Sequence, residues 1–296
     1  MPKVIVPATT ANLGAGFDSL GMALCLFNEV EYQVTSYGLK IHLSDEEKEF
    51  IAADERNLVY RAIERGLREI NIGMPGLVLR QKNDIPRTRG LGSSAACVVA
   101  GLHIANDISG GQLSKHKMIQ LAAEIEGHPD NILPAILGGL TVGCMDGDLV
   151  RYAKIEPPDR LKCCLLIPPY TVSTKRARSS LPQEVTLSDA VFNLSRSALL
   201  VAAMANGDLS LLDTATQDKL HQSYRAKLIP RYGRTVKAAM QNGALGCFIS
   251  GSGSALIAFV NANYSAFLQS MQQELEGFGW RIELVSHSRE GARIFD

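Results

Sequence analysis

The sequence has no excess of charge of either sign. Lys and Arg together number 30 in its 296 residues, Asp and Glu together also number 30, and the formal net charge is therefore zero. A chain without net charge has no general electrostatic attraction for nucleic acid or for an anionic membrane surface. We therefore expect neither as a partner, and any anion-binding site must be formed locally.

Paired cysteines and an apolar leader are also missing. None of the six cysteines stands in a C-x-x-C pair, which disfavours a zinc ribbon or a thioredoxin-like motif. Residues 1–7 include no apolar signal core of useful length. A chain this long, with 46% hydrophobic residues, can form its core without disulfides, so we expect a reducing, cytoplasmic location.

One stretch without charge, residues 238–273, is long enough to suggest a membrane span. Its centre, Ser250-Gly251-Ser252-Gly253-Ser254, is polar and separates two short apolar runs at 246–249 and 255–260. Two strands joined by a glycine turn explain this pattern better than a helix in a bilayer. The sequence therefore predicts no membrane span.

The length and the apolar spacing indicate two domains of mixed α+β class. A chain of 296 residues suits two domains of ordinary size. The composition changes at Glu156-Pro157-Pro158, so we place the boundary near residue 155, between domains 1–155 and 156–296. Both halves alternate strand and helix patterns. The expected strands cover 3–6, 28–36, 77–81, 162–167, 246–249, 255–260 and 281–286, and the expected helices cover 57–71, 94–106, 114–126, 132–135, 188–204, 209–214, 230–242 and 264–276.

The segment with the strongest functional signal is Pro86-Arg87-Thr88-Arg89-Gly90-Leu91-Gly92-Ser93-Ser94-Ala95-Ala96. Two glycines remove side chains where a backbone must approach something closely, and a strongly apolar helix follows them. The free N–H groups and the positive dipole end of such a helix bind anions. An ordinary loop with a serine N-cap is the alternative. The chain contains no Gly-Lys dipeptide and hence no Walker loop, and no strand leads directly into this segment, as a dinucleotide fingerprint requires.

Two other segments are rich in small residues. Residues 7–21, Pro-Ala-Thr-Thr-Ala-Asn-Leu-Gly-Ala-Gly-Phe-Asp-Ser-Leu-Gly, form a tight loop in which Asn12 and Asp18 are the strong polar groups. Residues 243–254 read as a hairpin whose turn could brace another glycine loop. A crowded turn with backbone caps explains the first segment about as well as a site does.

Polar side chains that can bind metal or exchange protons gather in Glu124-Ile125-Glu126-Gly127-His128-Pro129-Asp130-Asn131. Glu124 and Glu126 point in different directions on a helix, so at most one of them joins a site. The second half adds arginines in residues 174–178 and 221–225, and arginine binds carboxylates with a two-point fork. Solvated side chains and simple helix caps are the alternative interpretation of both groups.

Taken together, these segments resemble the GHMP small-molecule kinases, the family of galacto-, homoserine, mevalonate and phosphomevalonate kinases. Residues 86–96 are similar to the phosphate loop of that family. Residues 7–21, His128-x-Asp130-Asn131, residues 173–178 and residues 221–230 resemble its homoserine kinase branch, whereas galactokinases and mevalonate kinases begin with a different motif. The similarity covers nearly the whole chain.

The resemblance implies a fold, a reaction and a set of residues. The fold has an N-terminal nucleotide-binding GHMP domain with a left-handed β-α-β crossover and a C-terminal ferredoxin-like domain, with the active site between them. The reaction is transfer of the γ-phosphoryl group of ATP to the side-chain hydroxyl of L-homoserine with Mg²⁺, giving O-phospho-L-homoserine for threonine synthesis. The implied ATP-binding residues are Asn57, Pro86, Arg87, Thr88, Arg89, Gly90, Leu91, Gly92, Ser93, Ser94, Ala95, Ala96, Ser250, Gly251, Ser252 and Gly253. The implied metal ligands are Ser94 and Glu126. The implied substrate-binding residues are Asn12, Asp18, His128, Asp130, Asn131, Arg178 and Arg225.

The proton acceptor is left open by the sequence. Mevalonate kinases place an Asp near the acceptor hydroxyl, and the similar position here is Asn131, which cannot take a proton. Asp130, Asp18 or the phosphate itself could accept it. We favour catalysis by positioning without a dedicated base, with Asn12 and Asn131 orienting the hydroxyl and Asp130 beside them.

Three other functions stay possible at this point. One is another kinase of the same family, of the mevalonate-pathway type. The second is a nucleotide sensor without turnover, which the presence of both Ser94 and Glu126 disfavours. The third is an interaction protein, which the small-residue loops disfavour. The resemblance also suggests a homodimer.

Overall fold

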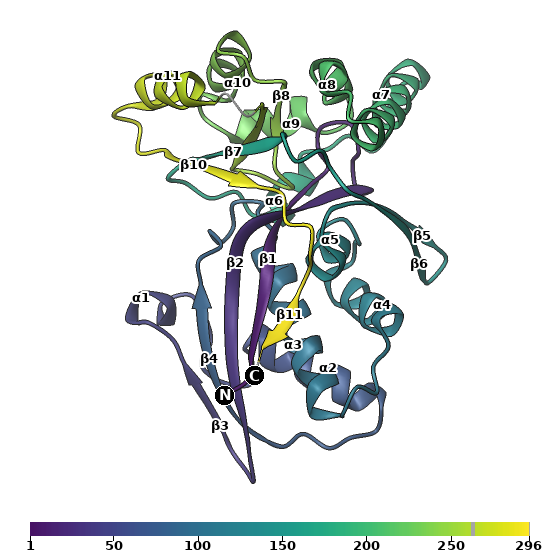
Figure 1. Ribbon diagram of the computed structural model, residues 1–296, viewed down its shortest axis with the longest axis vertical. Helices are drawn as coiled ribbons and strands as arrows, with labels where there is room; N and C mark the ends of the chain where they lie inside the picture. The colour runs from purple at the N-terminus through teal and green to yellow at the C-terminus, as the bar shows by residue number, and fades with distance from the viewer. Residues whose placement is uncertain (262–263, 296) are drawn as a thin grey trace.

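The computed structural model describes residues 1–261 and 264–295 and shows two α+β units, one above the other (Figure 1). The lower unit is built on a sheet with the strand order β11-β1-β2-β4-β3, in which β5 also pairs with β2, and β6 pairs with β5. Its strands are β1 (Lys3–Ala11), β2 (Leu20–Thr35), β3 (Leu39–His42), β4 (Gly76–Asn83), β5 (Leu140–Asp146), β6 (Leu149–Ile155) and β11 (Arg293–Phe295). Strands β3 and β4 run parallel and are joined through two helices, which makes a β-α-β unit.

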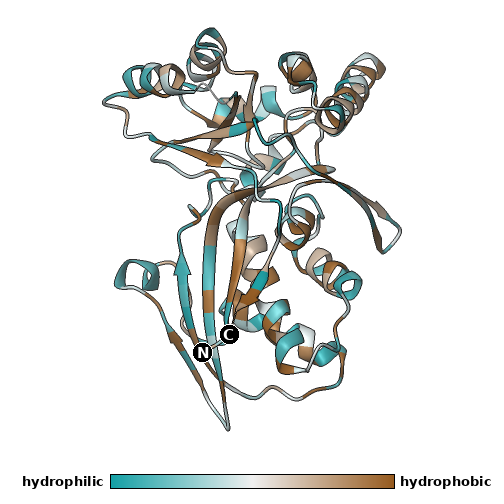
Figure 2. Ribbon diagram, in the orientation of Figure 1, coloured by the Kyte–Doolittle hydropathy of each residue, from teal (hydrophilic) through white to brown (hydrophobic). Residues whose placement is uncertain are grey.

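Helices cover one face of this sheet. They are α2 (Leu58–Glu69), α3 (Ser93–Ile108), α4 (Lys115–Glu126) and α5 (Ile132–Leu137), while the short α1 (Asp45–Lys48) lies apart from them (Figure 1). Helix α3 is the central one, because it packs against β1 and against the helices around it, and Figure 2 shows its hydrophobic character. A helix that is buried on several sides must be apolar all round, as this sequence is.

The upper unit contains an antiparallel sheet with the strand order β10-β7-β9-β8. Its strands are β7 (Lys162–Ile167), β8 (Gly246–Ile249), β9 (Leu256–Val260) and β10 (Arg281–Ser286). In chain order this is the 4-1-3-2 arrangement with helices after the first and third strands, so the expectation of a ferredoxin-like domain is confirmed. The strand pair that flanks the Ser250–Ser254 turn is also confirmed.

Both faces of the upper sheet are covered. Cys164 and Leu166 of β7 face α10 (Tyr232–Gln241) and α11 (Ser265–Leu275). Cys163 and Leu165 belong to the core that continues into the lower unit. This alternation follows from the two-residue period of a strand. The remaining elements are α6 (Thr174–Ser179), α7 (Leu187–Asn206), η1 (Leu209–Leu211), α8 (Leu212–Ala215), α9 (Gln222–Arg225) and η2 (Ala226–Leu228).

The chain returns to the lower unit at its end. Strand β6 ends at Ile155 and β7 begins at Lys162, close to the boundary proposed near residue 155. Strand β11, however, pairs with β1, and the backbone N–H of Ala292 donates to the carbonyl of Ala135. The last residues therefore add a strand to the sheet of the lower unit. Dividing the chain at residue 155 alone would assign this strand to the wrong unit.

Several element boundaries differ from the sequence predictions. Strand β1 continues through Ala11 and β2 begins at Leu20, so the predicted loop at 7–21 is reduced to its centre. The reason is burial: Thr9, Thr10 and Ala11 are enclosed and show no alternation to detect. Residues 173–178 were expected as a loop but form α6, which Ser173 caps. The sequence prediction lacked β3, β5, β6, β11, α1 and α9 as well.

One described helix, α7, is long and apolar enough to cross a membrane by length and composition alone. Only 22% of its most apolar window is buried. Its C-terminal half packs on the upper sheet through Leu200, Ala203 and Met204, which are fully buried. The first half of this helix therefore carries its apolar side chains on the surface.

The close approach of α2 and α3 generates a stability prediction. A Cβ added to Gly101 of α3 would lie 2.5 Å from the carbonyl oxygen of Val59 and 2.6 Å from the Cβ of Ala62. Gly101→Ala should lower the free energy of unfolding by about 1–3 kcal/mol, although alanine is the better helix former. The measurement is urea denaturation, with Gly73→Ala as the control, since nothing lies within 4 Å of that position. Equal stability of the two variants would contradict the predicted close packing.

Candidate active site

The predicted phosphate loop leads directly into α3. Gly90 and Gly92 both have positive φ, 74° and 71°, and Gly92 is the N-cap of α3 without any side-chain hydrogen bond to the helix. The first N–H groups of α3 are therefore left for a ligand, as the sequence pattern predicted. Helix α3 begins at Ser93, one residue before the predicted start.

The two glycines are required by protein contacts as well. A Cβ on Gly90 would lie 2.0 Å from the carbonyl oxygen of Ser250, and one on Gly92 would lie 1.9 Å from Oγ1 of Thr9. The Ser250 hydroxyl lies 2.6 Å from the carbonyl oxygen of Gly90. The N–H of Ala255 donates to the carbonyl of Arg89. The Ser250–Gly253 turn thus lies directly behind the loop, which is the arrangement we expected of it.

Both arginines of the loop donate hydrogen bonds to backbone carbonyls of neighbouring segments. The Arg89 guanidinium donates to the carbonyls of Pro168 and Pro169 at 3.1 and 3.0 Å. Arg87 donates to the carbonyl of Phe50 at 2.9 Å. Both side chains hold neighbouring segments, so the attraction for an anion rests mainly on the backbone and the helix dipole.

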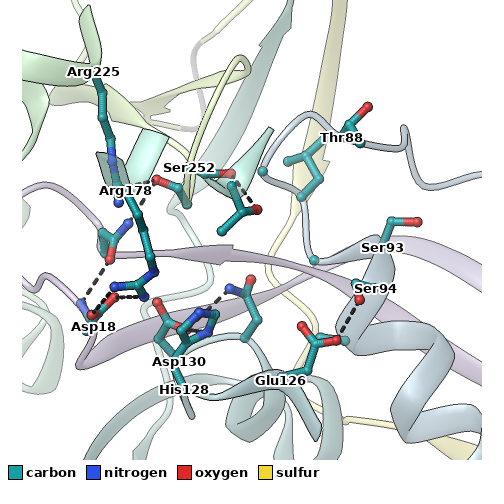
Figure 3. Close-up of a pocket in the computed structure, with 18 residues that line it drawn as sticks. Asp18, Thr88, Ser93, Ser94, Glu126, His128, Asp130, Arg178, Arg225 and Ser252 are labelled. Carbon is teal, nitrogen blue, oxygen red and sulfur yellow. Dashed lines mark hydrogen bonds and ion pairs between the residues drawn. The ribbon is translucent and has the colours of Figure 1, made fainter. Parts of the chain in front are cut away.

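The side chains of Ser94 and Glu126 meet at the N-terminus of α3. The Ser94 hydroxyl donates to Glu126 Oε1 at 2.5 Å, and Figure 3 shows the pair beside the loop. Among the described residues no three His, Cys, Asp or Glu side chains gather around a possible metal position. Mg²⁺ needs only one or two protein oxygens because it keeps waters and phosphate oxygens as its other ligands. The Ser94–Glu126 pair therefore fits a magnesium ion held jointly with a phosphate.

A cluster of opposite charges lies at the other side of the cavity. Arg178 of α6 binds Asp18 with two hydrogen bonds of 3.0 and 2.9 Å (Figure 3). Arg225 of α9 is buried and donates to the carbonyl of Gly251 at 2.8 Å. Its Nε is buried without a hydrogen-bond partner in the described structure. Both guanidiniums lie over the ring of Phe17, at 5.9 and 5.1 Å from its centre.

Asp130 is the buried carboxylate of the site. Burial and the nearby charge of Asp18 raise its pKa to about 7, against the opposing effects of Arg178 and of hydrogen bonds from Asn131. Nδ1 of His128 lies 3.6 Å from Asp130 Oδ1. Burial, followed by the charge of Arg178, lowers the pKa of His128. A neutral imidazole beside a carboxyl that titrates near neutrality can hold or exchange a proton.

All three predicted asparagines have their side-chain amides engaged within the protein, and that of Asn131 donates to Asp130. Asn12 donates to the Gly251 carbonyl and accepts from the N–H of Asp18. Asn57 caps α2 by accepting from the N–H of Val59, and its amide group donates to Ala52. Asn131 accepts from the Thr9 hydroxyl at 2.7 Å. The first two thus shape the site through the backbone that they hold.

Two cavities meet at the loop. The first, about 160 Å³, is bounded by the loop and by both charge groups, with the following lining residues: Asn12, Asp18, Thr88, Gly90, Leu91, Gly92, Ser93, Ser94, Ala95, Glu126, His128, Asp130, Asn131, Thr174, Arg178, Arg225, Gly251 and Ser252. The second, about 360 Å³, shares Thr88, Ser93 and Ser94 with it. The structure therefore brings together most of the predicted site residues. Pro86, Arg89, Ala96, Ser250 and Gly253 line neither of these two cavities and act behind the loop.

Sequence reasoning missed several lining residues. Thr174 reaches the first cavity from the start of α6, next to the Ser173 cap, and the Ser-Thr pair was a signal that pointed to it. The second cavity is lined from α1–α2, β4 and α3, where no motif marked the residues. They are Phe50, Ile51, Ala52, Arg56, Leu58, Gln81, Asn83 and Cys97.

Comparison with known proteins gives the same picture. Residues 57–139 match the model of the GHMP kinases N terminal domain, and residues 200–275 match that of the GHMP kinases C terminal. A homoserine kinase of Caldicellulosiruptor bescii is 44% identical over all of this chain and 97% of its own length. A crystal structure of homoserine kinase from Cytophaga hutchinsonii superimposes with a TM-score of 0.89 at 31% identity, covering 99% of this chain and 96% of that one.

A mevalonate kinase structure shares the fold at a TM-score of 0.72, but with 17% identity this likeness extends to the fold alone. The full-length similarity is to homoserine kinases, and it agrees with a cavity that pairs a glycine loop with two arginines. The chain belongs to the GHMP kinase family and, within it, to the homoserine kinases.

Proposed function

We propose that this chain transfers the γ-phosphoryl group of ATP to the side-chain hydroxyl of L-homoserine, in the route to threonine. The observation that carries the proposal is that one cavity joins the free N-terminus of α3 to Asp18, Arg178 and Arg225. The first part attracts phosphate oxygens, and the second part carries both charges that a free amino acid needs.

The nucleotide would occupy both cavities. The second cavity is the larger one and lies next to the loop, so it suits the nucleoside. Its wall combines the Phe50 ring with the amides of Gln81 and Asn83, as an adenine site does. The phosphates would then run along residues 88–95 to the N-terminus of α3.

Ser94 and Glu126 would hold the magnesium ion, and Glu126 would give up its hydrogen bond with Ser94 to do so. When bound, Mg²⁺ neutralises charge on the transferring phosphoryl group. The chain itself supplies the loop N–H groups, which orient the phosphate, and the walls that fix the acceptor beside it.

The amino acid would enter as an exchange of charges. Asp18 and Arg178 bind each other in the structure. A zwitterion can take the place of both partners, because its ammonium group can bind Asp18 while its carboxylate binds Arg178. The unpartnered N–H of Arg225 provides a further donor for the carboxylate. Mevalonate has a carboxylate but no amino group, so it would leave Asp18 unpaired. The charge pair therefore favours an amino acid.

Asp130 is the carboxylate that we propose as proton acceptor, in place of the base-free transfer favoured by the sequence. Asp18 would face the ammonium group of the bound substrate, and the amide of Asn12 is engaged elsewhere. Asp130 is buried beside Asn131, and its pKa of about 7 suits proton transfer at neutral pH. Asn131 then orients the hydroxyl.

Location and further partners follow from the sequence. The zero net charge supports a chain without nucleic-acid or membrane partners, and the family is one of metabolic enzymes, so we propose a cytoplasmic location.

The reaction is tested by ADP release from purified protein with ATP, Mg²⁺ and, in parallel, homoserine, mevalonate, galactose or serine. We expect turnover with homoserine above all others. Arg225→Leu should raise KM for homoserine by an amount equivalent to about 2–5 kcal/mol, because it removes a buried partner of the carboxylate. KM for ATP should stay within a factor of about three. Preference for mevalonate, or an unchanged homoserine KM in the variant, would refute the assignment of the substrate or of Arg225.

The buried Asp130 also predicts how stability varies with pH. Its folded pKa lies above the unfolded value, so its contribution to stability is complete below about pH 4 and is lost as the pH rises through about 7. Asp130→Asn should therefore gain stability over wild type by on the order of 3 kcal/mol between pH 5 and pH 8. Urea denaturation at both pH values measures this, with the exposed Asp148→Asn as control. Parallel pH curves for Asp130→Asn and wild type would show that the carboxyl is ionised throughout.

We further propose that the chain forms a homodimer through α7. Leu187, Val191 and Leu194 recur at helical spacing and are 81%, 54% and 71% exposed. The three side chains of this stripe are all uncharged. A two-fold dimer buries the same patch of both copies, which suits a stripe that is uncharged and long.

The dimer is tested by light scattering after size-exclusion chromatography. Wild type should have twice the mass of the chain, and Val191→Glu with Leu194→Glu should have the mass of one chain. Gln272→Glu, at an exposed position of α11, is the control and should remain dimeric. A wild-type protein of single-chain mass at about 10 µM would refute the proposal.

A further inference from the structure

His221 is fully buried and contacts both units of the protein, although it does not line the cavity. It stands one helical turn before Arg225, at the N-terminus of α9. Its Nε2 lies 2.8 Å from the carbonyl oxygen of Gly14, in the loop after β1. Its Nδ1 lies 3.3 Å from Nη1 of Arg225, and its ring stacks on Phe17 with 5.1 Å between centres.

These neighbours allow a single protonation form. The Gly14 carbonyl can only accept, so Nε2 must carry the hydrogen. The Arg225 guanidinium can only donate, so Nδ1 must offer its lone pair. His221 is therefore neutral and protonated at Nε2 whenever both contacts are made.

The surrounding charges agree with a neutral ring. Asp218 is the nearest carboxylate, with Oδ1 at 3.7 Å from Nε2, but its oxygens already accept from the N–H groups of Leu220, His221 and Gln222 and from Asn193. Asp18 also favours the charged form, whereas Arg225 opposes it. Burial, the largest effect, lowers the pKa of His221.

We propose that His221 is a positioning residue for the carboxylate of the amino-acid substrate, which it controls by accepting a hydrogen bond from Arg225 while it donates one to the Gly14 loop. The inference rests on the proposed function. Arg225 has two fixed acceptors, the Gly251 carbonyl and Nδ1 of His221, and together they aim the rest of its guanidinium at the cavity. Because the Gly14 loop also leads to Asp18, His221 sets the two charge groups of the substrate site relative to each other.

Two substitutions separate the two hydrogen bonds. His221→Asn places an oxygen near the position of Nδ1, so it keeps the acceptor for Arg225 and loses the bond to Gly14. His221→Gln places an amide N–H near the position of Nε2, so it keeps the Gly14 bond and loses the acceptor. Both variants lose the stacked ring, which makes each the control for the other.

The assay compares L-homoserine with 3-amino-1-propanol, which has the same hydroxyl and amino groups but no carboxylate. His221→Gln should raise KM for homoserine about tenfold to a hundredfold, the usual effect of a lost hydrogen bond to a charged group. His221→Asn should raise it less than about threefold, and kcat/KM for 3-amino-1-propanol and KM for ATP should be nearly equal in all three proteins. Added to Arg225→Leu, His221→Gln should change nothing further, since the residue acts through Arg225.

The outcomes are distinguishable. Equal effects of the two variants on homoserine, or equal losses with 3-amino-1-propanol, would overturn the positioning role and leave the proposed function standing. Absence of homoserine phosphorylation by wild type would refute the proposed function itself. Nitrogen NMR of the unaltered protein gives an answer even if the variants do not fold: hydrogen on Nε2 alone supports the proposal, and hydrogen on Nδ1 overturns it.

Discussion

The contact between two stretches of bare main chain holds the site together. The loop around Gly90 comes from the lower unit, and the Ser250–Gly253 turn comes from the upper sheet. They approach until the Gly90 position has no room for a Cβ, and the Ser250 hydroxyl fixes the loop carbonyl. A loop supported in this way keeps its N–H groups directed at a phosphate without moving at the moment of reaction. The two units thus form a single site.

The charged groups of the cavity differ in how deeply they are buried and in whether another group neutralises them. Asp18 and Arg178 are partly exposed and neutralise each other, so they can separate when a zwitterion arrives. Arg225 is buried against the Gly251 carbonyl, the neutral His221 ring and the face of Phe17. The charges of Asp18, Asp130 and Asp218 favour its charged form, but none of these carboxylates is paired with it within the described residues. A buried cation that lacks a directly bound counter-ion is stabilised by a ligand that supplies one. The site therefore favours an occupant with a carboxylate at this position.

Helices and strands were predicted correctly from the sequence where a local pattern, such as apolar spacing or a helix cap, determines the structure. The strand at 162–167 and the helix after Ser114 were predicted because apolar spacing and a cap act locally. The sequence failed to predict β11, three residues that pair with β1 at the opposite end of the chain. The site residues that stand in motifs were found, whereas the nucleoside cavity was not, since Gln81 and Asn83 belong to an ordinary strand. The directions of Arg87 and Arg89 depend on carbonyls far along the chain, which no local pattern reveals.

The same distinction explains why a motif residue can act without touching a ligand. His221 and Arg225 are four residues apart, a spacing that brings side chains together on a helix, but the sequence assigned only Arg225 to the substrate site. The structure divides their roles: Arg225 lines the cavity, and His221 turns toward Gly14 and Phe17. Asn12 does both, because it lines the cavity while its amide holds the Gly251 carbonyl and the backbone of Asp18. In this fold the residues around the substrate are held by neighbours from the other unit. A sequence motif can therefore indicate a contact between the two units as well as a residue that binds substrate.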